Sequence, residues 1–241
     1  MEAKLAKQDP AEKAKRAKAA DGRIYFSYAQ IHEAVSSCVP KVKAFNPDVI
    51  IAIGGGGFIP ARMLRTEVRV PILAVSLKLY DHETDQMQSK VVKTQWFDET
   101  SEEGKKVRGK RVLIVDEVDD TRKTLKFCVD EVKKTNVPSA IAVLVVHNKL
   151  KKKLAELPKD VVYIAAENVP DNWNCYPWDA AKYDGRSIYE HEDLARQCLV
   201  SGNKGEKNIV EMEKKLQKMK IQYDNLSAEL ERCKKNAGGS A

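Results

Sequence analysis

The sequence predicts an α/β fold: a mostly parallel, twisted sheet flanked by helices, followed by a helical tail. Short apolar runs at 49–53, 72–77, 112–115 and 140–146 have the composition of strands buried on both faces of a parallel sheet. Segments with helix-like spacing of apolar residues separate several of these runs, as strand–helix–strand units require. A charged segment with heptad spacing closes the chain.

Composition limits the class of protein. The 241 residues are 43% hydrophobic, which is enough for a packed core, and no apolar run is long enough to span a membrane. The net charge is +7, but residues 21–202 carry 27 basic and 26 acidic side chains, so the excess lies at the two ends. Nucleic-acid binding is therefore not expected. Five cysteines without a close pair predict reduced thiols in a cytoplasmic protein.

Three parts follow from these patterns. Residues 1–20 are rich in Lys, Ala and Glu and almost lack large apolar residues, which predicts a flexible basic leader or a partly populated helix. A weak targeting or membrane-surface role is an alternative for this leader. Residues 21–200 form the globular domain, and Gly202 and Gly205 mark a linker to a heptad helix at 206–236.

The domain opens with a helix and a glycine loop. Ile31, Val35, Val39, Val42 and Phe45 have near-helical spacing, and Ser27 is placed to cap that helix, whereas Pro40 predicts a bend or break. The apolar run 49–53 leads into Gly54–Gly57. Four glycines after a strand allow backbone amides to approach an anionic ligand closely.

A polar stretch follows the run 72–77. Residues 81–94 lack helical periodicity, and Val91, Val92, Trp96 and Phe97 indicate one leg of a hairpin. A long polar loop inside a compact enzyme is often a lid. The alternative is a surface hairpin with a solvated Lys78.

The stretch from Val112 to Leu125 carries the strongest functional signal. A buried strand leads into four acids, and these precede Thr121, Arg122, Lys123, Thr124 and a helix start. The N–H groups of a helix start bind anions, while adjacent carboxylates bind Mg²⁺ or a sugar diol. A ligand that combines a phosphorylated ribose with a metal ion would satisfy both the N–H groups and the carboxylates. The alternative is an acidic loop without a ligand.

Two further strands complete the sheet. The run 140–146 is followed by His147 and Lys149, and the segment 151–153 reads as a solvated lysine turn. The strand 161–165 precedes an aromatic segment that contains Trp173, Tyr176 and Trp178. Clustered aromatic side chains usually form core, but beside a nucleotide site an aromatic face can stack on a base.

The tail has its own pattern. Apolar residues recur at alternating spacings of three and four at Ile209, Met212, Leu216, Met219, Tyr223, Leu226, Leu230 and Cys233. This seam predicts a coiled coil that pairs with a partner, or a helix docked on its own domain.

Asp116–Thr124 resembles the phosphoribosyl-diphosphate (PRPP) binding motif of the type I phosphoribosyltransferases, in which two acids precede Asp-Thr-Gly-x-Thr. The resemblance covers roughly 22–182 and implies the fold of that family, with a small hood over its site. Arg122 stands where the family usually has glycine. With an ordinary φ it would keep the loop intact and add a cation near the phosphate.

The resemblance also implies site roles. Asp116 and Glu117 would hold the ribose diol and Mg²⁺, and Asp120 would be the general base near purine N7. The 5′-phosphate would lie on Asp120, Thr121, Arg122, Lys123 and Thr124. Gly55, Gly56, Gly57 and Lys78 would bind pyrophosphate, and Lys78 and Tyr80 would begin a mobile loop.

The segment Trp173–Asp179, with the pattern Trp-x-x-x-Pro-Trp-Asp, resembles the hood of bacterial and fungal xanthine-guanine and hypoxanthine-guanine phosphoribosyltransferases, and this resemblance implies the remaining roles. Lys149 would contact the 6-oxo group of the purine, Trp173 would stack on the ring, and the backbone of Asn174 would read its edge. Asp179 would help to hold a Mg²⁺ that touches pyrophosphate. His147 is only a nominal acid/base candidate, and Trp178 is a packing residue.

The expected activity is purine salvage: transfer of the phosphoribosyl group of PRPP to xanthine, guanine or hypoxanthine, giving the nucleoside 5′-monophosphate and pyrophosphate. Adenine is disfavoured, because a lysine ammonium only donates hydrogen bonds. The choice among the three 6-oxopurines stays open. A homodimer or homotetramer is expected. The alternatives are a non-catalytic PRPP or nucleotide sensor with the same fold, and a scaffold that acts through its tail.

Overall fold

The structure is a computed structural model that describes residues 16–80, 90–182, 185–199 and 216–227, together with Glu229 and Arg232. Contacts divide the chain into two units, Met1–Leu199 and Val200–Ala241. Among the described helices, none combines the length and the apolar character needed to cross a membrane.

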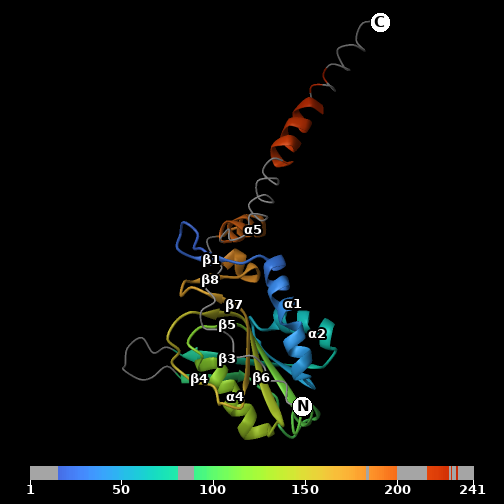
Figure 1. The fold of residues 1–241 in the computed structure, drawn as a ribbon, viewed down its shortest axis with the longest axis vertical. Helices are drawn as coiled ribbons and strands as arrows, with labels where there is room; N and C mark the ends of the chain where they lie inside the picture. The colour runs from blue at the N-terminus through green and yellow to red at the C-terminus, as the bar shows by residue number, and fades with distance from the viewer. Residues whose placement is uncertain are drawn as a thin grey trace. The chain divides into compact units, whose positions relative to one another are not determined.

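A six-stranded sheet forms the centre of the first unit, in the order β4-β3-β2-β5-β6-β7 (Figure 1). All neighbours pair in parallel except β3 and β4, which form an antiparallel hairpin. The strands are β2 (Val49–Gly54), β3 (Ile72–Tyr80), β4 (Lys90–Gln95), β5 (Arg111–Asp119), β6 (Ala140–Lys149) and β7 (Val162–Val169). The predicted strands and hairpin leg are therefore confirmed. Of the predicted lid, residues 81–94, the part 81–89 lies outside the described residues, and 90–94 belongs to β4.

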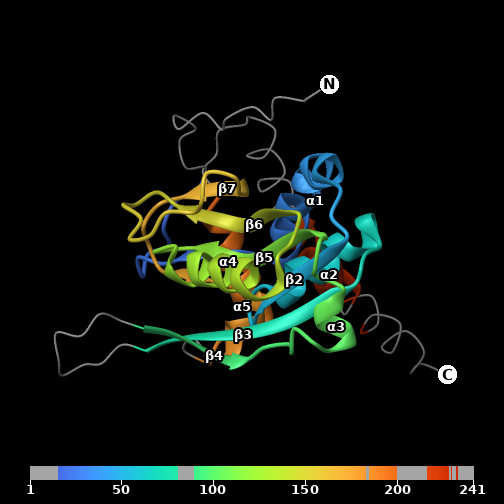
Figure 2. The same cartoon turned by 90° about the horizontal axis from the view of Figure 1, so that it is seen from below.

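Helices cover both faces of the sheet (Figure 2). Leu113 and Val115 of β5 pack with α1 (Tyr28–Phe45) and α2 (Phe58–Val68), whereas Val112 and Ile114 pack with α4 (Lys123–Asn136). Alternate side chains of a strand point to opposite faces, so β5 is buried on both. The acidic residues that follow this strand are thereby held at the centre of the sheet edge.

Helix α1 begins after Ser27 and extends to Phe45, as its spacing predicted. Ser27 accepts a hydrogen bond from the Gln30 amide, and the Gln30 side chain accepts one from the Ser27 amide, which is a capping box. The predicted break at Pro40 is wrong, because the helix runs through it to Phe45. Cys38 and Val42 are buried on either side of Pro40. Their packing offsets the one backbone hydrogen bond that proline removes.

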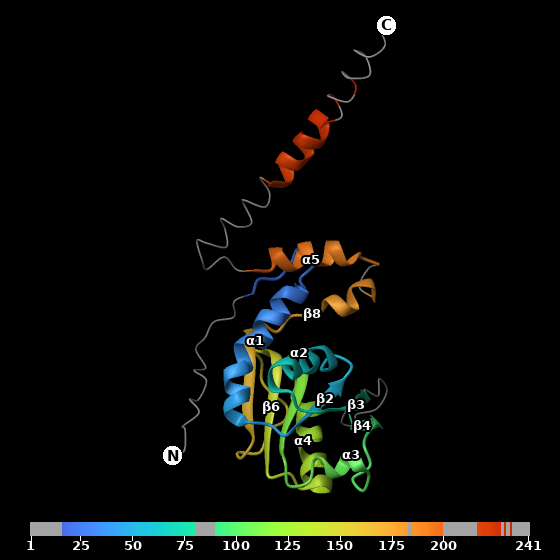
Figure 3. The ribbon, with the colours of Figure 1, turned by 90° about the vertical axis from the view of Figure 1, so that its right-hand side faces the viewer.

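A hood covers the carboxyl end of the sheet. It contains a small parallel pair of β1 (Ile24–Tyr25) with β8 (Asn174–Cys175), the 3₁₀ helix η1 (Pro177–Lys182) and α5 (Ile188–Gln197). Figure 3 shows α5 and β8 at the same end of this unit. The sequence predicted neither the β1–β8 pair nor α5, nor the short helix α3 (Glu102–Lys105).

The predicted flexible leader is too long at its C-terminal end. Arg16 is buried, its guanidinium donates to both carboxylate oxygens of Glu167 at 3.1 and 3.3 Å, and Nη1 donates to Gln30 at 2.9 Å. The Ala17 amide donates to the carbonyl of Cys198. The folded unit therefore includes residues 16–20. Residues 1–15 lie outside the described part of the chain.

The described part of the second unit is a helix over 216–227. The seam residues Leu216, Met219, Tyr223 and Leu226 are exposed. Ile209, Met212, Leu230 and Cys233 lie outside the described residues, and the coiled coil stays a prediction. The four described cysteines, all in the first unit, are free and buried.

Candidate active site

A cavity of about 330 Å³ lies where the carboxyl ends of β2 and β5 meet. In an open α/β sheet this edge is the usual place for a ligand. The cavity brings the predicted glycine loop, acid pair and phosphate loop into one site. Its lining is Ile53, Gly54, Gly55, Gly56, Leu77, Asp116, Glu117, Val118, Asp119, Asp120, Thr121, Arg122, Thr124 and Leu125.

The glycine loop packs tightly at Gly54, Gly56 and Gly57 and is open at Gly55. A Cβ on Gly56 would lie 1.9 Å from Cδ of Glu117, and one on Gly57 would lie 2.4 Å from the carbonyl oxygen of Val115. A Cβ on Gly55 would meet nothing within 4 Å. Gly55 is thus the position in this loop at which a ligand can approach the backbone most closely. Gly57 caps α2 and does not line the cavity.

The acid pair at the end of β5 suits a divalent cation. Asp116 is buried and accepts a hydrogen bond from the Glu117 amide at 2.9 Å. Burial, and then the charge of Glu117, raise the pKa of Asp116 well above its ordinary value. Oε2 of Glu117 is buried without a hydrogen-bond partner. Two carboxylates in this situation fit a hard cation with oxygen ligands.

Asp179, the third predicted metal ligand, lies apart from this pair. It belongs to η1 and does not line the cavity. Among the described residues, no group of three or more His, Cys, Asp and Glu side chains could hold a metal ion. One ion shared by Asp116, Glu117 and Asp179 is therefore not supported. The role of Asp179 toward a pyrophosphate-bound ion stays a prediction.

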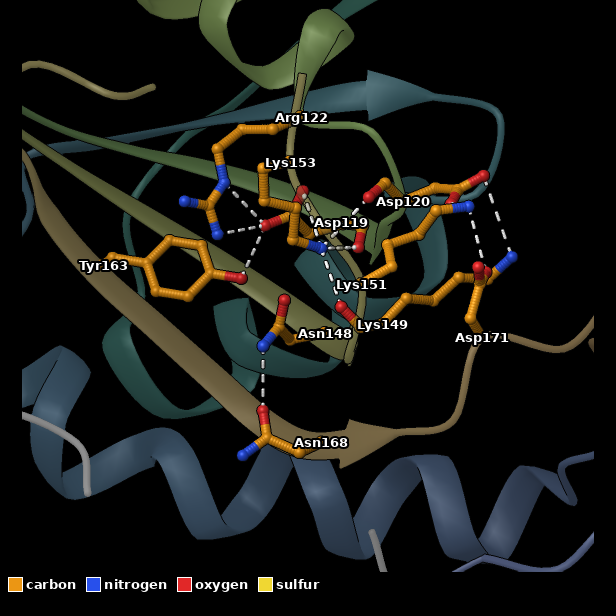
Figure 4. Close-up of polar contacts among 10 residues, drawn as sticks. All are labelled: Asp119, Asp120, Arg122, Asn148, Lys149, Lys151, Lys153, Tyr163, Asn168 and Asp171. Atoms are coloured by element: carbon orange, nitrogen blue, oxygen red, sulfur yellow. Dashed lines mark hydrogen bonds and ion pairs between the residues drawn. The ribbon is translucent and has the colours of Figure 1, made fainter. Parts of the chain in front are cut away.

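The phosphate loop departs from the family pattern at Arg122. Its φ is 70°, in the left-handed region that favours glycine, so the condition of an ordinary φ, under which arginine would keep the loop intact, is not met. Nε and Nη2 of Arg122 donate to Oδ2 of Asp119 at 2.9 and 2.7 Å (Figure 4). The guanidinium is thus committed to a carboxylate, while Thr121 and Thr124 line the cavity beside the start of α4. Lys123 lies outside the lining.

Lysines surround the predicted general base. Nζ of Lys151 lies 2.9 Å from Oδ1 of Asp120 and also 2.9 Å from Oδ1 of Asp171, while Nζ of Lys149 lies 3.7 Å from Oδ2 of Asp120. Burial raises the pKa of Asp120, but the bond from Lys151 and the neighbouring lysine charges outweigh it, so that the pKa is lowered overall. Asp120 is therefore ionised at neutral pH.

The expectation of a solvated lysine turn at 151–153 is wrong for two of its three residues. Lys151 bridges Asp120 to Asp171 of the hood segment. Nζ of Lys153 donates to the carbonyls of Asp119 and Asp120 at 2.6 and 3.0 Å, and its side chain is largely buried. Lys152 is exposed, as predicted. The three lysines of this short turn therefore have different surroundings.

None of the three predicted purine-binding residues lines the cavity, and Lys149 contacts a lining residue, Asp120. Lys149 is 9% exposed at the end of β6, and Asn174 is buried in β8. Trp173 is 60% exposed, so its ring is accessible to a ligand. Lys78 on β3 is exposed and outside the lining.

His147 belongs to the core. Its ring stacks on Phe26 with centroids 3.8 Å apart, and Nδ1 is 2.8 Å from the Tyr176 hydroxyl. Burial, and then the charge of Arg16, lower the pKa of His147 well below its ordinary value. The ring is neutral at pH 7 and does not line the cavity. It is therefore not an acid or base of this site.

Four residues that sequence reasoning assigned no role participate in the site: Asp119, Lys151, Lys153 and Tyr163. Tyr163 on β7 donates its hydroxyl to Oδ2 of Asp119 at 2.8 Å. The alternation of Lys151 and Lys153 about an exposed Lys152 is the one sequence signal for this group.

This arrangement is that of an open α/β protein whose ligand site lies past the carboxyl ends of its parallel strands. The Phosphoribosyl transferase domain family matches residues 24–181. The chain is 40% identical over 204 residues to Xanthine phosphoribosyltransferase 1 of Saccharomyces cerevisiae, covering 72% of this chain and 95% of that protein. Hypoxanthine-guanine phosphoribosyltransferase of the same yeast is 40% identical over 195 residues, covering 67% and 87%.

Solved structures agree. A hypothetical protein from Neisseria gonorrhoeae, crystallised with bound ppGpp, is 41% identical and superposes with a TM-score of 0.64 over 73% of this chain and 96% of that one. A purine phosphoribosyltransferase from Pyrococcus horikoshii is 28% identical, with a TM-score of 0.54 over 65% and 94%. The chain therefore belongs to the phosphoribosyl transferase family, among the purine phosphoribosyltransferases.

Proposed function

We propose that this chain is a purine salvage enzyme that transfers the phosphoribosyl group of PRPP to a 6-oxopurine, giving the nucleoside 5′-monophosphate and pyrophosphate. One observation carries the proposal. The glycine loop, the Asp116–Glu117 pair and the loop before α4 line a single cavity, and Lys149 stands 3.7 Å from Asp120 at its side. The cavity thus offers complementary groups for a pyrophosphate, a ribose and a 5′-phosphate.

The purine is held by the groups beside this cavity. The Lys149 ammonium donates to the 6-oxo group, Trp173 stacks on the ring, and the Asn174 backbone reads its edge. Because Lys149 has no acceptor, a 6-amino purine is disfavoured. The relatives named for xanthine and for hypoxanthine-guanine are equally identical to this chain, so identity does not select among the three bases.

Positioning and electrostatics carry the reaction. Purine N9 forms a bond to the ribose C1′ as the C1′–O bond to pyrophosphate breaks, and the Asp120 carboxylate accepts the proton from N7. The amides of the glycine loop and the start of α4 hold the two anionic ends of PRPP. Asp116 and Glu117 would hold the ribose diol and Mg²⁺. When bound, Mg²⁺ supplies positive charge that neutralises the leaving pyrophosphate.

The protein around this site is proposed to be cytoplasmic and a homodimer or homotetramer, with the tail pairing as a coiled coil. The buried, free thiols of the described cysteines support a reducing compartment. The exposed seam residues of 216–227 support a partner for the tail.

The test is product formation from PRPP and Mg²⁺ with xanthine, guanine, hypoxanthine and adenine in parallel. We expect turnover of at least one 6-oxopurine and little with adenine. The order of kcat/KM identifies the substrate. If no product forms with any of the four bases while PRPP still binds, the proposal of an enzyme is wrong and a PRPP sensor is favoured.

A further inference from the structure

The carboxylate of Asp119 is completely buried, although the proposed reaction makes no use of it. Its Oδ2 accepts three hydrogen bonds: from Nε and Nη2 of Arg122 at 2.9 and 2.7 Å, and from the Tyr163 hydroxyl at 2.8 Å. Oδ1 lies 3.5 Å from Nζ of Lys153. Burying a charge is costly unless it is paired and hydrogen-bonded, so this cluster is a specific arrangement of the site.

The backbone of Arg122, next to this cluster, has an unfavourable conformation. Arg122 is the N-cap residue of α4, and its side chain makes no capping hydrogen bond. Its φ of 70° lies in the left-handed region. A residue with a Cβ adopts this region only when its surroundings hold it there. The guanidinium bonds to Asp119 and lies 4.8 Å from the ring centroid of Tyr163. The side chain therefore fixes the backbone from which the phosphate loop is built.

Lys153 secures the other side of the loop. Its ammonium donates to the carbonyls of Asp119, Asp120 and Lys149 at 2.6, 3.0 and 2.9 Å. The Leu154 amide donates to the carbonyl of Thr121 at 3.0 Å. The turn after β6 thus binds the carbonyl groups of the phosphate loop. With its carbonyl groups directed toward this turn, the loop can direct its amide groups the other way, toward an anion.

We propose that Asp119 is a positioning residue for the 5′-phosphate: through Arg122, Tyr163 and Lys153 it holds residues 120–122 in the anion-binding conformation, and the Arg122 guanidinium serves Asp119 rather than the phosphate. The inference rests on the proposed function in taking the ligand of this loop to be a 5′-phosphate. Figure 4 shows the three partner side chains converging on Asp119 from β7, the loop and the turn after β6.

A direct contact between Arg122 and the phosphate predicts the opposite outcome for Asp119. Removing the charge of Asp119 would then release Arg122 toward the ligand and leave binding unchanged or stronger. If Asp119 positions the loop, the same change weakens binding. Asp119→Asn therefore separates the two roles by the sign of its effect.

The experiment measures the dissociation constant of ribose 5-phosphate by calorimetry on the full chain, with Tm recorded for each variant. Asp119→Asn and Arg122→Ala should weaken binding about tenfold, as expected for lost hydrogen bonds to a charged group. Tyr163→Phe removes one bond to Asp119 at a residue that does not line the cavity, and it should weaken binding by a smaller factor. Arg122→Gly should weaken it less than Arg122→Ala, because glycine adopts a positive φ freely.

Arg111→Ala is the matched control. Arg111 lies at the opposite end of β5, donates to the Phe45 carbonyl at 2.8 and 2.6 Å, and stands 4.6 Å from the Phe45 ring centroid. Its loss should lower Tm without changing affinity for ribose 5-phosphate. Turnover assays should show a raised KM for PRPP, with the KM for purine unchanged, in Tyr163→Phe and both Arg122 variants.

The outcomes are distinguishable. Unchanged or tighter binding in Asp119→Asn, or equal losses in Arg122→Gly and Arg122→Ala with none in Tyr163→Phe, would overturn the positioning role and leave the proposed function standing. If Asp119→Asn does not fold, the Arg122 and Tyr163 variants still decide. A wild-type chain that binds neither ribose 5-phosphate nor PRPP would refute the proposed function and this inference together.

Discussion

Nζ of Lys149 lies 3.7 Å from Oδ2 of Asp120, which places the proposed reader of the purine 6-oxo group next to the proposed acceptor of its N7 proton. The pairing of β5 with β6 produces this contact, because Asp119 stands opposite Asn148 at the ends of the two strands. In a purine, O6 and N7 are on the same edge. Two adjacent side chains can therefore address both atoms at once.

Lys151 sets the protonation range of Asp120, so its removal should change the pH profile. Lys151→Ala removes the main influence that lowers the pKa of Asp120, so that pKa should rise. Because activity requires the ionised carboxylate of Asp120, the acidic limb of the pH profile of kcat/KM should move to higher pH. Lys152→Ala, an exposed neighbour, should leave the limb in place. Profiles that coincide for Lys151→Ala and wild type would refute this role.

Trp173 should contribute to purine affinity and little to stability. Its ring is 60% exposed. Trp173→Ala should raise the KM for the purine about tenfold, the usual effect of losing one base–aromatic stack, with Tm almost unchanged. Trp178 stacks on Tyr176 with centroids 4.7 Å apart, and Trp178→Ala should instead lower Tm. Steady-state kinetics and thermal melts on both variants check this. A normal purine KM in Trp173→Ala would exclude stacking.

The glycine loop allows a test at neighbouring positions. Gly55→Ala places its Cβ in open space, so the protein should fold normally, with a raised KM for PRPP if the ligand approaches this backbone. Gly56→Ala would place its Cβ 1.9 Å from Glu117, so kcat should fall and the Mg²⁺ requirement should increase. Titrations of PRPP and Mg²⁺ measure both effects. Wild-type kinetics in both variants would show that the glycine loop is not part of the active site.

His147 should make stability depend on pH. Its folded-state pKa is well below that of an unfolded histidine, which is about 6.5. Below pH 6.5 the unfolded chain binds the proton more readily, so the contribution of His147 to stability is present above that pH and is lost as the pH falls. Between pH 7 and 5.5, Tm should fall less steeply in His147→Gln than in wild type. Parallel curves would contradict the assignment.

The central strands could be predicted from sequence because each one is buried on both faces and reads as an apolar run. Val112–Val115 is the clearest case, and its two faces pack against different helices as the pattern requires. The Ser27 cap was also local enough to predict, although the reciprocal bond to the Gln30 side chain was not predicted. By contrast, Ile24–Tyr25 pairs with Asn174–Cys175 far along the chain, and two-residue strands carry no periodic signal.

The site was predictable where residue type determines chemistry. Asp116, Glu117, Asp120 and Thr121, all predicted site residues, line the cavity. The contacts of Asp119, Lys151 and Lys153 were missed because they depend on the meeting of β5, β6 and β7, which spacing within one segment does not reveal. The left-handed φ of Arg122 was missed for a related reason: a side chain paired with a buried carboxylate overrides the backbone preference of its own residue.

The most direct measurement of the central claim is the turnover of Asp120→Asn with PRPP, Mg²⁺ and the preferred 6-oxopurine. Asparagine keeps the shape of the side chain and cannot accept the N7 proton, so kcat should fall by about 10²–10⁴, while the dissociation constants of PRPP and the nucleotide product stay near the wild-type values. Near-normal turnover in this variant would contradict the assignment of Asp120 as the general base.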